Sequence, residues 1–111
     1  MIRVTYHRAF NRVSVVGHAG SAEKGKDLIC ASASILVYTL ADFVKKAEKE
    51  GQVWCSVIHI DEGDTIISCS PNEGKKESIT EVFDAICRGF ELLARDYPDN
   101  ISYEIKKYIS P

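Results

Sequence analysis

Two side chains that could together catalyse acyl transfer flank one short loop of this sequence. His18 ends a run of alternating polar and apolar residues, and Cys30 follows the glycine-bearing, charged stretch 20–26. A thiol beside an imidazole supplies a nucleophile and a group that moves protons, which is the minimum equipment for covalent acyl transfer. We therefore expect the chain to fold back across the loop and to bring Cys30 and His18 together.

Cys30 is expected in the first turn of a helix that begins near Leu28. Unpaired N–H groups and the positive end of the helix dipole favour a thiolate there, and the same N–H groups are candidates for an oxyanion hole. Asp27 has two alternative roles. By default it is the N-cap residue of the helix; alternatively, its carboxylate orients the His18 imidazole as the third member of a triad.

Packing is the competing explanation for both residues when only composition and spacing are considered. Free cysteines are among the residues most often buried, so Cys30 could be a core residue and His18 a polar strand end. The small residues 31–34 also fit a helix that approaches a sheet closely. His7 and His59 are expected on strand faces, without a role in the site.

The patterns on either side of the loop predict the element order ββαββαβ. Alternation of apolar and polar residues predicts strands, apolar stripes at helical spacing predict helices, and Gly, Pro and acidic turns separate them. Strands are expected at 2–7, 12–16, 53–60, 65–70 and 101–106, and helices from Leu28 to Gly51 and over 79–94. An α+β fold of two layers follows, in which a mostly antiparallel sheet of four to five strands carries both helices on one face.

Composition limits the class of protein. The chain has 111 residues with a formal net charge of −2 and no basic block, so we expect a single domain over residues 1–111 that does not bind nucleic acid. No apolar run approaches the roughly 20 residues of a membrane span, and the first residues lack the core of a signal peptide. We therefore expect a cytoplasmic protein that does not enter a membrane.

None of the four cysteines has a partner at the spacing of a zinc site, so no metal is expected. In a reducing cytosol they should be free thiols. Cys55, Cys69 and Cys87 lie in apolar runs and are expected to be small core residues. Trp54 and the tyrosines are expected in the core or in an interface.

One longer pattern resembles a known family. The segments Gly17-His18-Ala19, Gly25-Lys26-Asp27 and Leu28-Ile29-Cys30-Ala31, followed by Ser34, resemble the bacterial ribosomal-processing cysteine proteases called Prp. The resemblance implies a homodimeric α/β protease that needs no cofactor. Its substrate would be the short N-terminal extension of ribosomal large-subunit protein twenty-seven.

The same resemblance implies roles for single residues. Cys30 would be the nucleophile, His18 would transfer protons, and Ser34 would contact substrate. The loop that carries Gly20, Gly25 and Lys26 would act as a gate that moves to admit the peptide. Two rival functions stay open at this point, a non-enzymatic ribosome-associated binding module of the same fold and a Cys–His acyl or thioester transferase.

Overall fold

A computed structural model describes residues 1–18 and 26–107, and the side chains of 26 and 27 are not part of that description. In chain order the elements are β1 (Ile2–His7), a short 3-10 turn η1 (Arg8–Phe10), β2 (Arg12–Val16), α1 (Lys26–Lys49), β3 (Val53–Asp61), β4 (Asp64–Pro71), α2 (Lys76–Asp96) and β5 (Ile101–Lys106). The predicted order ββαββαβ is confirmed.

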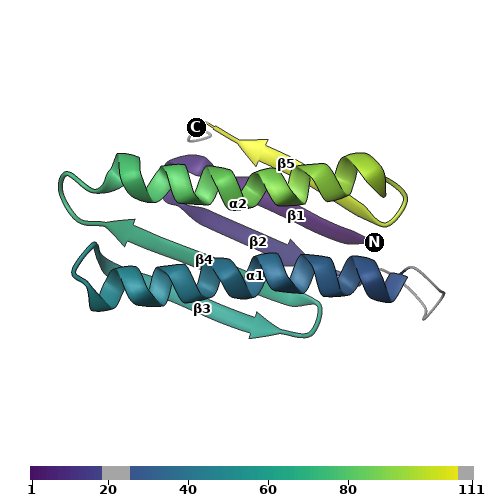
Figure 1. The fold of residues 1–111 in the computed structure, drawn as a ribbon, viewed down its shortest axis with the longest axis horizontal. Coiled ribbons are helices and arrows are strands. Elements are labelled where there is room, and N and C mark those ends of the chain that lie inside the picture. Colours follow the sequence, from purple (N-terminus) through teal and green to yellow (C-terminus); the bar gives the residue numbers. More distant parts are fainter. Residues whose placement is uncertain (19–25, 108–111) are drawn as a thin grey trace.

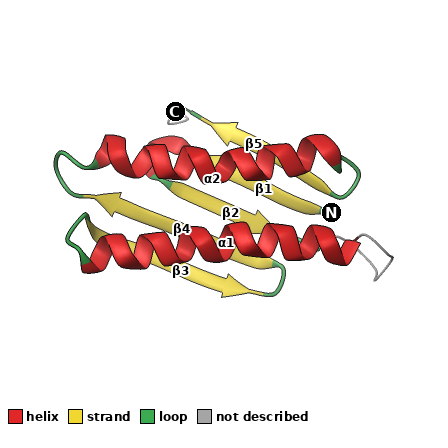
Figure 2. Ribbon diagram, viewed as in Figure 1, coloured by secondary structure: helices red, strands yellow, loops and turns green. Residues whose placement is uncertain are grey.

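The five strands form one sheet in the order β3-β4-β2-β1-β5, with both helices across the same face (Figures 1 and 2). β1 with β2, β2 with β4, and β3 with β4 pair antiparallel, whereas β5 runs parallel to β1. The expected two-layer, mostly antiparallel fold is therefore confirmed. β3 and β5 form the two edges of the sheet, and among the described residues no element covers the face opposite the helices.

The core lies between the helices and the sheet. Ile2, Val4 and Tyr6 are buried in β1 while the residues between them are more exposed, as the alternating pattern predicts. The apolar stripes of the helices face the same layer, with Leu40 and Val44 from α1 buried completely. This burial fixes which face of α1 looks outward, and so which of its residues are available to a site.

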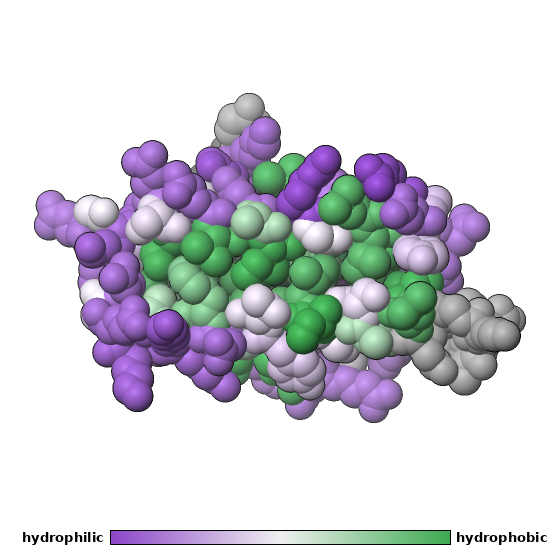
Figure 3. Space-filling view, viewed as in Figure 1, coloured by the Kyte–Doolittle hydropathy of each residue, from purple (hydrophilic) through white to green (hydrophobic). Residues whose placement is uncertain are grey.

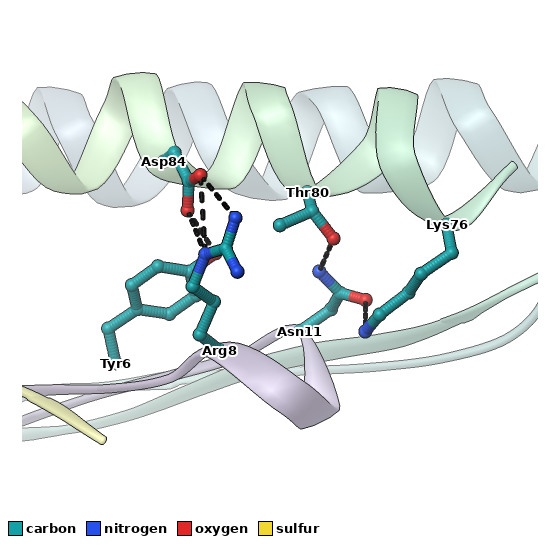
Figure 4. A network of polar contacts seen from close by, with 6 residues as sticks. All are labelled: Tyr6, Arg8, Asn11, Lys76, Thr80 and Asp84. Atoms are coloured by element: carbon teal, nitrogen blue, oxygen red, sulfur yellow. Dashed lines mark hydrogen bonds and ion pairs between the residues drawn. The ribbon is translucent and has the colours of Figure 1, made fainter. Parts of the chain in front are cut away.

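A polar network attaches α2 to the turn between β1 and β2 (Figure 4). The Tyr6 hydroxyl donates to Asp84 Oδ1 at 2.8 Å, and the Arg8 guanidinium donates to both oxygens of the same carboxylate. Burial alone would raise the pKa of Asp84, but the hydrogen bonds from Arg8 and Tyr6 outweigh it and hold that pKa below its ordinary value. Nearby, buried Asn11 donates to Thr80 at 3.0 Å. These contacts fix α2 along the sheet.

One of the three cysteines predicted to be core residues is not. Cys69 and Cys87 are buried, and burial raises their thiol pKa values to about 11 and about 12. Cys55 is exposed, because a register shift between Val53 and Cys55 interrupts the alternation that would have turned it inward. Trp54 lies at the same irregularity and is 69% exposed, so it is not a core residue either.

The segment Leu28–Lys49 of α1, with a mean hydropathy of 1.6, is long and apolar enough to cross a membrane by length and composition alone. A core helix meets the same criterion, and α1 does bury one face against the sheet. Its opposite face is unusual, since Leu28, Ile35 and Tyr38 are each about 60% exposed. The hydropathy of α1 therefore reflects two apolar faces, of which the sheet covers one.

Candidate active site

A cavity of about 520 Å³ opens at the end of the molecule where α1 begins. Three segments form its walls: the end of β2 with the residues that follow it, the first half of α1, and the turn between β3 and β4. His18 and Cys30 both line it, and both are exposed. The structure thus brings together the two residues that the sequence singled out.

α1 presents one column of side chains to this cavity. Cys30, Ser34 and Tyr38 follow one another at intervals of four residues, which places them on the same face of a helix. Ser34, expected to contact substrate, lies one turn beyond the thiol. Tyr38 also lines the cavity, although the sequence pattern predicts for the tyrosines only a place in the core or in an interface.

The opposite wall fixes the backbone at His18. The Gly17 N–H donates to the Gly63 carbonyl at 2.9 Å, so the end of β2 is bonded to the β3–β4 turn. Gly17 has φ of +99°, and a Cβ built on it would lie 2.2 Å from the Met1 carbonyl oxygen. Glycine is required here on both grounds. The backbone that leads from β2 to His18 is therefore fixed by its hydrogen bond to Gly63 and by its close approach to Met1.

The start of α1 differs from the prediction. The helix begins at Lys26, two residues earlier than expected, so the backbone of Asp27 lies inside its first turn. The Asp27 side chain is outside the described residues, and its capping role stays a prediction. Cys30 is the fifth residue of the helix and not in its first turn. An α-helix leaves only its first few N–H groups unbonded, and the dipole effect fades within the first turn. At this place in α1 the Cys30 N–H is expected to bond within the helix, and an oxyanion hole from the other N–H groups around Cys30 stays a prediction.

The expected gate lies mostly outside the described residues. Gly20 and Gly25 lie outside the described residues, and so do the side chains of Lys26 and Asp27. The backbone of Lys26 belongs to α1 and not to a loop. Whether the Asp27 carboxylate orients His18 stays a prediction.

The third wall was also missed from the sequence. Asp61, Glu62 and Asp64 line the cavity, although the sequence indicated only a hairpin turn there. Their position follows from strand pairing, since Val16 at the end of β2 stands opposite Asp64 at the start of β4. The local sequence does not predict that β2 pairs with β4, so it could not indicate that this turn lies beside His18. Within the described residues, no group of three His, Cys, Asp or Glu side chains is arranged to hold a metal ion.

Comparison with known protein families gives one decisive result. The model of the family described as cysteine protease Prp matches residues 1–102. The chain belongs to the Prp cysteine protease family. It is therefore a cysteine protease, which confirms the resemblance and favours peptide hydrolysis over the binding-module and transferase alternatives. Comparison with curated proteins gave no match.

Solved structures share the fold over nearly the whole chain. SMU.848 from Streptococcus mutans has a TM-score of 0.72 at 27% identity, and the match covers 97% of this chain and 96% of that one. An essential ribosomal processing protease Prp from S. aureus, in complex with a covalently linked product peptide, has a TM-score of 0.69 at 22% identity, over 96% of this chain and 100% of that one. The same protease with a substrate peptide gives 0.67 at 18% identity, over 95% and 97%.

Proposed function

We propose that this Prp family member is a ribosomal-processing endopeptidase that removes the short N-terminal extension of ribosomal large-subunit protein twenty-seven, with Cys30 as nucleophile and His18 as proton carrier. The observation that carries the proposal is that both side chains line one cavity, with Ser34 one turn beyond the thiol. The S. aureus relative, described as a ribosomal processing protease with a covalently linked product peptide, supports a peptide substrate.

The reaction follows from the two groups. The Cys30 thiolate attacks the scissile carbonyl, so that an S–C bond forms, and the C–N bond then breaks as His18 protonates the leaving amine. His18 next takes a proton from water, the hydroxide attacks the thioester, and the S–C bond breaks to release the carboxylic acid and the thiol. The shorter N-terminal fragment leaves as this acid.

The charge of the cavity supports a basic substrate. Asp61, Glu62 and Asp64 line it, and none of its lining residues in the described part of the chain is Lys or Arg. A negatively charged wall favours cationic peptides over anionic ones, and proteins that bind RNA are rich in Lys and Arg. The segment of a ribosomal protein next to its extension fits this requirement.

Cleavage of a peptide that spans the junction between the extension and the mature ribosomal protein tests the proposal. Cys30→Ala is expected to reduce cleavage to background, because no other thiol lines the described cavity. Cys55→Ala is the matched control, since Cys55 is equally a free, exposed thiol but lies outside the cavity. Mass spectrometry after acid quenching should find the acyl group on Cys30. Cleavage by Cys30→Ala at the wild-type rate would show that Cys30 is not the nucleophile. Equal cleavage of a scrambled peptide would contradict the proposed substrate.

We further propose that the protein acts in the cytoplasm as a homodimer. Leu28, Ile35 and Tyr38 on the outward face of α1 support self-association, because a row of exposed large apolar side chains is typical of an interaction surface. Figure 3 shows apolar residues gathered over the middle of the helix-bearing face, with hydrophilic residues around its rim.

A further inference from the structure

We infer that Gly63, in the turn between β3 and β4, is the residue that positions the catalytic imidazole. A Cβ built on Gly63 would lie 2.6 Å from His18 Nε2 and 2.8 Å from His18 Cε1. Real Cβ atoms do not approach other heavy atoms this closely, so any other residue at this position would displace the ring from where it lies. The imidazole of His18 therefore lies against the backbone of Gly63, where no side chain intervenes. This inference rests on the proposed role of His18.

A second contact links the same turn to the residue before the histidine. The Gly63 carbonyl accepts a hydrogen bond from the Gly17 N–H at 2.9 Å. One residue therefore holds both the backbone that leads into His18 and the ring of His18 itself. The turn joins two paired strands of the sheet, β3 and β4, so its ends are held by their ladder of hydrogen bonds.

Glycine is needed at this position for a backbone reason as well, and the two reasons can be separated. Gly63 has φ of +73°, where L-residues are strained. Gly74 has φ of +82°, and a Cβ built on it meets nothing within 4 Å. Gly74→Ala therefore introduces the same kind of backbone strain without a neighbour. The difference between Gly63→Ala and Gly74→Ala isolates the contact with His18.

The consequence for catalysis is specific. An added methyl group must push the imidazole away from the turn, and a misplacement of about 1 Å costs about 10²-fold in rate. Cleavage of the junction peptide by Gly63→Ala is expected to show kcat lowered about 10²-fold, with a smaller change in KM because the acidic side chains of the same turn are retained. Gly74→Ala is expected to keep the wild-type kcat.

A double-mutant cycle separates positioning from a general structural effect. If Gly63 acts through His18, Gly63→Ala should lower the residual rate no further once His18 has been changed to Ala. An additional loss in that background, comparable to the loss in wild type, would overturn the inference. Full activity of Gly63→Ala would overturn it too, while leaving the proposed protease function intact.

Nuclear magnetic resonance provides a readout that does not depend on activity, and its central measurement is made on the wild-type protein. In the wild-type protein, the ring protons of His18, assigned by their loss in His18→Ala, should show a nuclear Overhauser effect to the Gly63 Hα protons. Gly63→Ala should shift those ring resonances and Gly74→Ala should not. Absence of the wild-type cross-peak would overturn the inference even if the protein proves to be an active protease, and its presence would support the contact even if the junction peptide is not cleaved.

Discussion

At the scale of single residues, the glycine of the Gly17-His18-Ala19 segment has a physical role of its own. Gly17→Ala combines a positive φ with a Cβ 2.2 Å from a backbone oxygen of Met1, which cannot rotate away as a side chain would. We expect a loss of unfolding free energy well above the roughly 1–2 kcal/mol that a left-handed residue alone costs. Urea denaturation measures it. Gly51→Ala is the control, since Gly51 has φ of +76° and open space around it; equal losses in the two variants would show that the Met1 contact yields easily.

The sequence indicated which residues of the cavity are candidates for the chemistry, but not which residues hold them in place. His18 and Cys30 were recognisable because a thiol and an imidazole flank one loop, and both line the cavity. Gly63 was not, because Glu62-Gly63-Asp64 has the composition of any hairpin turn and its neighbour in space is distant in the sequence. The identity of a side chain indicates what chemistry it can do, whereas its position in space depends on which strands pair.

At the scale of elements, the attachment of α2 to the β1–β2 turn predicts a pH dependence of stability. The pKa of Asp84 is lowered in the folded state. Its contribution is therefore fully present above the unfolded carboxyl pKa of about 3.9 and is lost as pH falls through the lower folded pKa. Asp84→Asn should remove this acid-sensitive part, on the order of 1 kcal/mol after allowance for the 39% exposure of the carboxylate.

Urea unfolding of both proteins, at about neutral pH and at about pH 2–3, measures the effect. The wild type should lose more stability on acidification than Asp84→Asn does. Asp96→Asn serves as the control, because Asp96 pairs with Arg95 on the surface and exposed pairs contribute little. An acid response of Asp84→Asn as large as that of the wild type would show that the Arg8–Asp84 pair does not stabilise the fold.

Element prediction succeeded where local periodicity decides the structure and failed where pairing does. The apolar stripes and alternating runs gave both helices and all five strands in order. Neither strand alone predicts that β5 pairs parallel to β1. The alternation of apolar and polar residues indicates which face of a strand is buried, but not which strand is its neighbour. Cys55 is exposed because the strand register shifts after Val53. A shift by one residue does not change the composition of the strand, so the sequence pattern did not predict it.

At the scale of the whole molecule, the outward face of α1 changes character along its length. Leu28, Ile35 and Tyr38 are exposed in its first half, whereas Lys45 and Lys49 are exposed in its second. Apolar side chains of this size are stabilised when a partner removes them from water, by about 25 cal/mol per Å². The apolar half is also the half that lines the cavity, so self-association there would lie next to the site.

We therefore expect sedimentation at micromolar concentration to give the mass of a dimer. Ile35→Glu should shift it to monomer, because a charge at the centre of the apolar half would have to be buried without a partner. Lys45→Glu, a charge change at an exposed position in the polar half of the same helix, should leave the dimer intact. Circular dichroism should show equal helix content in all three proteins, so that a shift in mass reports association and not unfolding. A wild-type protein that sediments only as a monomer would contradict the homodimer, and an Ile35→Glu variant that stays dimeric would place its interface elsewhere than on α1.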